Sequence, residues 1–148
     1  MSGSDHRFYV TWEEFYRDAR ALGWRLKDTA KWRGMIAITR GGLVPSAIVA
    51  REIGVRLIDT LCIASYGDED DQQVDAETLK IPQIDHDGEG WLIIDDLSDT
   101  GKTAKIARRL FPKAHIAAIY AKPLGKDAID SYMTEVSQDT WIVFPWEE

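Results

Sequence analysis

Short apolar segments alternate with helix-compatible segments along this chain, and that alternation restricts its fold more than any other feature. Continuous apolar runs of this size are typical of strands that are buried on both faces of a sheet. Strands that alternate with helices favour an α/β fold, in which a central, mainly parallel sheet is flanked by helices. The strands predicted in this way are residues 35–38, 57–63, 91–94 and 115–121.

Helix signals lie before and between these strands. Thr11 and Glu14 have the spacing of a capping box, which predicts a helix that runs to about Leu22 and ends at Gly23. A length of 148 residues suffices for one hydrophobic core, and no linker divides the chain, so we expect a single domain spanning 1–148. The other predicted elements are helices over 45–53 and 102–111 and a last strand over 141–144.

The acidic residues are concentrated in one segment. Residues 67–90 contain nine acids and a single base, Lys80, so this segment carries −8 and leaves +1 for the rest of a chain whose net charge is −7. No basic stripe of the kind that nucleic-acid binding needs is present, so no nucleic-acid partner is expected. An anionic ligand must therefore be held by local donors, backbone amides or a metal ion.

The same region, residues 65–90, is poor in apolar residues and contains three glycines and one proline. Two interpretations are open. It is either a solvated, partly disordered loop or a mobile lid over a site, because long loops in ordered domains are uncommon outside these two classes.

Several features indicate the cytoplasm. The longest apolar run is only six residues, 116–121, far short of a membrane span, and the N-terminus has no apolar region typical of a secretory signal. The single cysteine, Cys62, lies in an apolar stretch and is expected to be a buried, reduced thiol.

The segment after strand 91–94 carries the most unusual chemistry. Residues 100–103 (Thr-Gly-Lys-Thr) lie between a strand and a helix, where converging amides and the positive end of the helix dipole suit a phosphate. Three acids, Asp95, Asp96 and Asp99, stand beside this turn and would repel a phosphate unless they bind something else. Carboxylates bind sugar hydroxyls and hard cations such as Mg²⁺. The pattern therefore predicts a phosphorylated ribose with a nearby metal ion.

Two common phosphate-binding motifs are excluded by counting. A Walker A loop needs a glycine five positions before Gly101, where this chain has Asp96, and no Gly-x-Gly-x-x-Gly fingerprint follows a predicted strand. Taken alone, residues 101–103 could be an ordinary helix start. The apolar strand and the acids before them favour the ligand-binding interpretation.

Residues 93–103 resemble the signature of the type I phosphoribosyltransferases: apolar residues, two acids, a short spacer and then Asp-Thr-Gly-x-Thr. From about Val10 to Trp146 the chain resembles the bacterial xanthine-guanine members of that family. The segments that carry this wider resemblance are 40–45, 88–90, 111–115, 121–123 and 138–142. The resemblance implies the type I phosphoribosyltransferase fold, with residues 65–90 as a mobile hood.

The resemblance implies two substrates, phosphoribosyl pyrophosphate (PRPP) and a 6-oxopurine, with Mg²⁺ as cofactor. Asp95 and Asp96 would contact the ribose hydroxyls, with Asp96 also near Mg²⁺, and Asp99 would bind N7 of the base and manage its proton. Residues 100–103 would hold the 5′-phosphate, and Arg40 with Gly41 the pyrophosphate. The full set implied for PRPP or nucleotide binding is Arg40, Gly41, Asp95, Asp96, Leu97, Ser98, Asp99, Thr100, Gly101, Lys102 and Thr103.

The purine contacts implied by the resemblance lie later in the chain. Lys122 would donate to the 6-oxo group, Trp141 would stack on the base, and the Ile142 carbonyl would accept from the exocyclic amine of guanine. An alternative is open at each position. Arg40 could be a surface arginine in a flexible turn, Lys122 a surface lysine, and Trp141 a packing residue. The other tryptophans are expected to be core or interface residues: Trp12, Trp24, Trp32, Trp91 and Trp146.

Two functions follow as hypotheses. The first is a purine salvage enzyme that makes GMP or XMP, and less readily IMP, from PRPP; the second is a non-catalytic regulator that senses PRPP or a nucleotide and binds nucleic acid. The acidic net charge of −7 and the presence of Asp99, Lys122 and Trp141 favour the enzyme. Gln72 and Gln73 stand where the hood of the family carries a basic residue.

The resemblance also implies an assembly and a location. The assembly would be a homotetramer, or at least a dimer, and the location cytoplasmic with weak peripheral association at the inner membrane. The chain ends at Glu148, where relatives continue with a short apolar tail, so contacts made by such a tail are not expected here.

Overall fold

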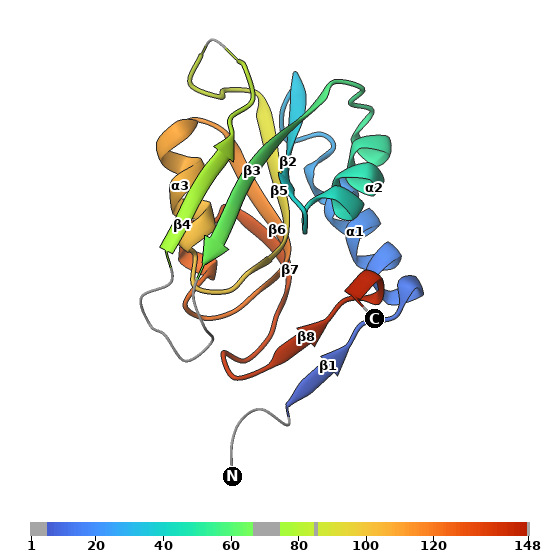
Figure 1. Ribbon diagram of the computed structural model, residues 1–148. Coiled ribbons are helices and arrows are strands. Elements are labelled where there is room, and N and C mark those ends of the chain that lie inside the picture. The colour runs from blue at the N-terminus through green and yellow to red at the C-terminus, as the bar shows by residue number, and fades with distance from the viewer. Residues whose placement is uncertain (1–5, 67–74, 85, 148) are drawn as a thin grey trace.

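Within the part of the chain that the structure describes, the central sheet has six strands in the order β4-β3-β2-β5-β6-β7, and every neighbouring pair is parallel except the antiparallel pair β3 and β4 (Figure 1). The computed structural model describes residues 6–66, 75–84 and 86–147. The strands are β2 (Gly34–Thr39), β3 (Ile58–Tyr66), β4 (Asp75–Lys80), β5 (Trp91–Ser98), β6 (His115–Ala121) and β7 (Ser131–Glu135). The predicted α/β class with a mainly parallel sheet is confirmed.

Helices cover both faces of this sheet. Helices α1 (Trp12–Leu26) and α2 (Leu43–Ile53) lie on one face, and α3 (Lys102–Leu110) lies on the other (Figure 1). Two short 3₁₀ helices follow, η2 (Lys126–Ala128) and η3 (Pro145–Glu147). Because both faces are covered, the central strands are apolar at consecutive positions rather than at alternate ones.

Consecutive residues of the central strands supply two separate cores. Met35 and Ile94 pack with Phe15 and Leu22 of α1 in the first core, and their neighbours pack with α3 in the second. The second core contains Ile36, Ile38, Leu61, Ile93, Ala104, Ala107 and Phe111. Burial of such side chains contributes about 1.5–3 kcal/mol each, so β2 and β5 are held firmly at the centre of the sheet.

Helix α1 is longer than its sequence signals predict. The capping box is present, with Glu14 N–H donating to Thr11 Oγ1 at 3.1 Å and Thr11 N–H donating to Glu14 Oε1 at 3.1 Å. The predicted end at Leu22 and Gly23 is wrong, because α1 continues to Leu26. A Cβ at Gly23 would lie 2.7 Å from Cβ of Glu52. This glycine therefore allows α1 to approach α2 closely instead of ending the helix.

The loop predicted over 65–90 contains regular structure at its start and in its middle. Strand β3 continues to Tyr66, and residues 75–80 form β4, the antiparallel edge strand beside it. The polar composition that indicated a loop is also the composition of an exposed edge strand. Lys80 Nζ donates to Asp59 Oδ1 at 2.7 Å across this pair. Residues 67–74, which include Gln72 and Gln73, and residue 85 lie outside the described residues.

A second, two-stranded sheet lies apart from the first (Figure 1). Strand β1 (Arg7–Tyr9) pairs in parallel with β8 (Trp141–Val143), so the two ends of the chain are joined. Strand β8 was predicted as 141–144, whereas β1 and β7 gave no clear sequence signal. Val10 N–H extends the pairing by donating to the carbonyl of Val143 at 3.0 Å.

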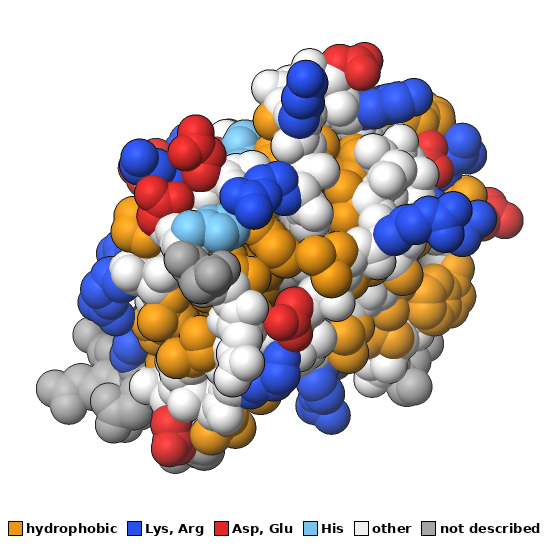
Figure 2. All heavy atoms as spheres, turned by 90° about the horizontal axis from the view of Figure 1, so that it is seen from above, with side chains coloured by type: hydrophobic (Ala, Val, Ile, Leu, Met, Phe, Trp, Pro, Cys, Tyr) orange, Lys and Arg blue, Asp and Glu red, His pale blue; other side chains and the backbone are white. Residues whose placement is uncertain are grey.

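Some surface features also differ from the sequence predictions. Cys62 is free but only partly buried, so the expected full burial is wrong. Trp12 and Trp24 are more than half exposed, so of their two expected roles, core or interface, the core role is excluded. Seen from above, at the end where β3 begins, Lys and Arg side chains are scattered among acidic and hydrophobic ones, and this face shows no continuous basic area (Figure 2). Among the described residues, no helix has the length and apolar character needed to cross a membrane.

Candidate active site

Strands β2 and β5 are neighbours, and their carboxyl ends lie together at the point where the order of strands along the chain reverses. The chain continues from β2 toward β3 on one side and from β5 toward β6 on the other. Such a topological switch point leaves a crevice at the carboxyl ends of the strands, where α/β proteins bind ligands. The two segments singled out from the sequence, 40–42 and 95–103, follow these two strands and meet at this crevice.

The turn after β2 is packed closely against β5. A Cβ at Gly41 would lie 2.6 Å from each carboxylate oxygen of Asp96, and a Cβ at Gly42 would lie 2.3 Å from the carbonyl oxygen of Ile94. Gly42 N–H donates to the carbonyl of Ile38 at 2.6 Å, which closes the turn. Gly42 is therefore required by the close approach of the two backbones, whereas a Cβ at Gly41 would displace the Asp96 carboxylate.

A cavity of about 780 Å³ opens between these segments. Arg40 and Gly41 line it on one side, and Asp95, Asp96 and Thr103 line it on the other. The remaining lining residues are Ile38, Thr39, Leu43, Val44, Ile63, Trp146 and Glu147. The cavity joins a guanidinium, a glycine-rich backbone and a pair of carboxylates.

Asp95 and Asp96 are both held in an environment that disfavours their charge. Burial, followed by the neighbouring Asp96 carboxylate, raises the pKa of Asp95 well above its ordinary value. Burial raises the pKa of Asp96 to about 6, and Glu147 adds to this increase. Two partly buried carboxylates side by side are stabilised by a cation or by hydroxyl donors, which the cavity leaves room for.

The turn that follows β5 presents the start of α3 to a second cavity of about 260 Å³. Strand β5 extends through Ser98, so the turn is shorter than predicted and comprises residues 99–101. Gly101 has φ +85° and is the N-cap of α3, so no side chain caps the first amides of the helix. Those amides are available to an anion. The residues of the signature that line this cavity are Asp95, Leu97, Ser98, Asp99, Thr100, Gly101, Lys102 and Thr103.

Ser98 anchors the turn to the segment that follows β6. Its side chain is buried, and its hydroxyl donates to the carbonyl of Gly125 at 2.8 Å. A Cβ at Gly125 would lie 2.3 Å from the Ser98 carbonyl oxygen. The Ser98 hydroxyl is therefore already used within the protein, and the backbone of Ser98 also holds Lys122, whose N–H donates to its carbonyl at 3.0 Å.

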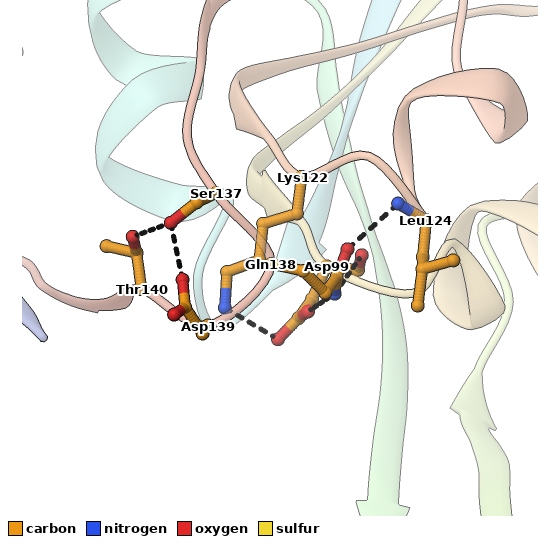
Figure 3. Close-up of polar contacts among 7 residues, drawn as sticks. All are labelled: Asp99, Lys122, Leu124, Ser137, Gln138, Asp139 and Thr140. Atoms are coloured by element: carbon orange, nitrogen blue, oxygen red, sulfur yellow. Dashed lines mark hydrogen bonds and ion pairs between the residues drawn. The ribbon is translucent and has the colours of Figure 1, made fainter. Parts of the chain in front are cut away.

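Asp99 belongs to the turn after β5, and its side chain lies beside that of Lys122 (Figure 3). Lys122 Nζ is 3.3 Å from Asp99 Oδ2, and the Lys122 side chain is only 6% exposed whereas that of Asp99 is 51% exposed. The alternative that Lys122 is a surface lysine is therefore wrong. The pair presents an ammonium donor next to a carboxylate acceptor at the edge of the site.

Comparison with known proteins identifies the family of this chain. Residues 9–148 match the family model described as phosphoribosyl transferase domain. The chain belongs to the phosphoribosyl transferase family. It is 54% identical over 148 residues to the xanthine-guanine phosphoribosyltransferase of Desulfotalea psychrophila, covering 99% of this chain and 91% of that protein. It is 53% identical over 140 residues to the protein of the same name from Nitratidesulfovibrio vulgaris, covering 95% and 84%.

A solved structure supports the fold. The crystal structure of purine phosphoribosyltransferase from Pyrococcus horikoshii superimposes with a TM-score of 0.79 at 29% identity, covering 97% of this chain and 95% of that one. The type I phosphoribosyltransferase fold expected from the signature is therefore confirmed.

The remaining predicted residues of this phosphoribosyltransferase lie on β8. Trp141 is half exposed, and its backbone N–H donates to the carbonyl of His6 at 2.7 Å. The Ile142 side chain is buried in the first core. The exposure of Trp141 does not fit the alternative of a core packing residue. Neither Trp141 nor Ile142 lines the two cavities described above. The link between β8 and the turn is made instead by Gln138, which hydrogen-bonds Asp99.

Three residues near the site were missed or misassigned from the sequence. Trp146 was expected to be a core or interface residue, and it does stack on Phe144 with ring centroids 4.9 Å apart, but it also lines the larger cavity. Glu147 and Gln138 were given no role. All three lie far along the chain from residues 95–103. Gln138 is the first residue of segment 138–142, which carried the resemblance, but Trp146 and Glu147 had no such signal.

Proposed function

We propose that this protein transfers the 5-phosphoribosyl group of PRPP to N9 of a 6-oxopurine and releases pyrophosphate. Guanine and xanthine are the proposed acceptors ahead of hypoxanthine, which gives GMP, XMP or IMP. The observation that carries the proposal is the crevice between β2 and β5, where Arg40 and Gly41 face Asp95, Asp96 and the start of α3. The two relatives above 50% identity, both called xanthine-guanine phosphoribosyltransferase, support the choice of acceptor.

PRPP fits the two cavities by charge. The 5′-phosphate is proposed to bind residues 100–103, whose amides and hydroxyls surround the free N-terminus of α3. The ribose diol is proposed to donate to Asp95 and Asp96. The pyrophosphate is proposed to bind Arg40, whose guanidinium can make two parallel contacts to phosphate oxygens, and the amide of Gly41.

The site also fits Mg²⁺. Asp95 and Asp96 offer oxygen ligands, and burial raises the pKa of both carboxyl groups. Among the described residues, no group of three His, Cys, Asp or Glu side chains is close enough to hold a metal alone. Mg²⁺ commonly binds one or two carboxylates and takes its other ligands from substrate oxygens and water, so Asp96 is proposed to hold the ion together with PRPP. The bound ion would neutralise charge on the leaving pyrophosphate.

The purine is proposed to lie against Lys122 and Asp99. The 6-oxo group and N7 are neighbours on one edge of the base, and they match the ammonium donor and the carboxylate acceptor that lie 3.3 Å apart. In the reaction N9 forms a bond to C1′ while the bond from C1′ to pyrophosphate breaks. The proton on N7 passes to Asp99. Arg40 stabilises the negative charge that develops on pyrophosphate.

We also propose that copies of this chain associate as a homotetramer or at least a dimer. The exposed aromatic side chains of α1, Trp12, Tyr16 and Trp24, offer apolar area for such contacts. Sedimentation of the purified protein at micromolar concentration tests this. A purely monomeric species would contradict it.

The experiment that tests the proposed reaction measures pyrophosphate release with PRPP, Mg²⁺ and each base in turn. We expect the highest kcat/KM with guanine and xanthine and a lower value with hypoxanthine. Failure of all three bases at saturating concentrations would contradict the enzyme. Tight binding of DNA or RNA at physiological salt by an inactive protein would favour the regulator instead, although the net charge of −7 opposes it.

A further inference from the structure

Gln138 makes contacts to two parts of the site at once (Figure 3). Its Nε2 donates to Asp99 Oδ1 at 2.8 Å and lies 3.3 Å from the Asp99 carbonyl oxygen. Its Oε1 accepts the N–H of Leu124 at 2.9 Å. The side chain therefore connects the segment before β8 with the turn after β5 and with the turn after β6.

The orientation of this amide is determined by its partners. A backbone N–H can only donate, so Leu124 requires the oxygen of the Gln138 amide to face it. The NH₂ group must then face Asp99, whose carboxylate oxygen accepts from it. The two contacts support each other, and reversing the amide would lose both of them. A hydrogen bond to a charged acceptor is about twice as strong as a neutral one.

The two carboxylate oxygens of Asp99 have different partners. Oδ1 accepts from Gln138, and Oδ2 faces Lys122 Nζ at 3.3 Å. The Asp99 side chain is 51% exposed, so packing alone does not fix its rotamer. Gln138 therefore restricts the direction of the carboxylate. The oxygen near Lys122, Oδ2, is then the one left to face the purine. We propose that Gln138 is a positioning residue that holds Asp99 in the direction from which it receives the purine N7 proton.

This inference rests on the role proposed above for Asp99, and it must be distinguished from a purely structural role. Residues 137–140 form a tight turn, in which the Ser137 hydroxyl donates to Asp139 Oδ1 at 2.7 Å and lies 2.5 Å from Thr140 Oγ1. If Gln138 served only to fasten this turn, its loss would weaken purine binding and stability. A positioning role instead lowers kcat and leaves the KM for PRPP unchanged.

The test compares Q138A and Q138E with the matched control S137A, which alters the same turn without touching Asp99. We expect Q138A to lower kcat about 10- to 100-fold, as loss of a hydrogen bond to a charged group predicts, with an unchanged KM for PRPP. S137A should retain wild-type kcat. Circular dichroism and thermal unfolding of all three variants separate loss of activity from loss of folding.

Q138E gives a readout that a structural role would not produce. It keeps the size of the side chain and the acceptor for Leu124 but places a second carboxylate against Asp99. We expect kcat at pH 8 to fall at least as far as in Q138A and to recover partly as the pH falls toward 6, when the added carboxyl takes up a proton and can donate again. A kcat for Q138E that does not depend on pH differently from wild type would overturn the inference.

A double variant separates this inference from the proposed function. If Gln138 acts through Asp99, adding Q138A to D99N causes no further loss of kcat. Additive losses, or a Q138A enzyme with wild-type kcat beside an impaired D99N enzyme, would overturn the positioning role alone. A D99N enzyme as active as wild type would remove the proposed role of Asp99, and with it the inference.

Discussion

Replacing Asp96 by asparagine is expected to stabilise the unliganded protein at high pH. Burial raises the pKa of Asp96 from its ordinary 3.8 to about 6 in the folded chain. The folded state therefore holds the proton more tightly than the unfolded state does. Stability is lost as the pH rises from about 4 through 6, because the unfolded chain ionises first, and it stays lower above that range.

The size of the effect follows from this pKa. At about 1.4 kcal/mol per pKa unit, the difference between 3.8 and about 6 corresponds to at most about 3 kcal/mol. Asparagine does not titrate, so D96N escapes this loss. The substitution also removes the Asp96 charge that helps to raise the pKa of Asp95. The loss of that charge likewise favours the folded state of D96N at high pH.

Urea unfolding at several pH values, with a chelator present, measures this effect. We expect the free energy of unfolding of D96N minus that of wild type to increase by up to about 3 kcal/mol between pH 4 and pH 8. The same variant should bind PRPP with Mg²⁺ more weakly, because Asp96 is a proposed ligand. A difference that stays constant with pH, or that decreases, would refute the reasoning that the carboxylate is destabilised by burial.

Three further substitutions test the proposed roles. D99N is expected to lower kcat by about 100-fold or more while the KM for PRPP changes only a few-fold, and steady-state kinetics would contradict this if both changed equally. K122A should weaken purine binding more than PRPP binding. Calorimetry with each ligand separately measures both affinities, and a larger loss for PRPP would contradict this prediction. G41A places a Cβ 2.6 Å from the Asp96 carboxylate oxygens and should weaken PRPP binding at least tenfold. The control R51A, at an exposed position of α2 that does not line the cavity, should not weaken it.

The central strands could be predicted because they are buried on both faces. Residues 115–121 form β6 within the predicted bounds, and 91–94 lie inside β5. Strands β1, β4 and β7 lie at edges or in the small sheet, where one side faces solvent and the apolar signal disappears. Gly23 was misinterpreted because a glycine that ends a helix and one that permits close helix packing look alike in the sequence.

The candidate site was easiest to predict where it is contiguous in the chain. Residues 95–103 carry acids, a glycine and hydroxyls in one run, so their chemistry is visible before folding. Gln138 and Glu147 reach the site through tertiary contacts across about 40 to 50 residues, and no spacing rule connects them to it. The burial that raises the pKa of Asp96 is likewise a property of the folded chain alone.

The most direct test of the central claim is a crystal structure with GMP and Mg²⁺. The account predicts that the phosphate contacts the amides and hydroxyls of residues 100–103 and that the ribose diol lies within hydrogen-bond distance of Asp95 and Asp96. A nucleotide bound elsewhere, with the turn at the start of α3 left without a phosphate, would contradict it.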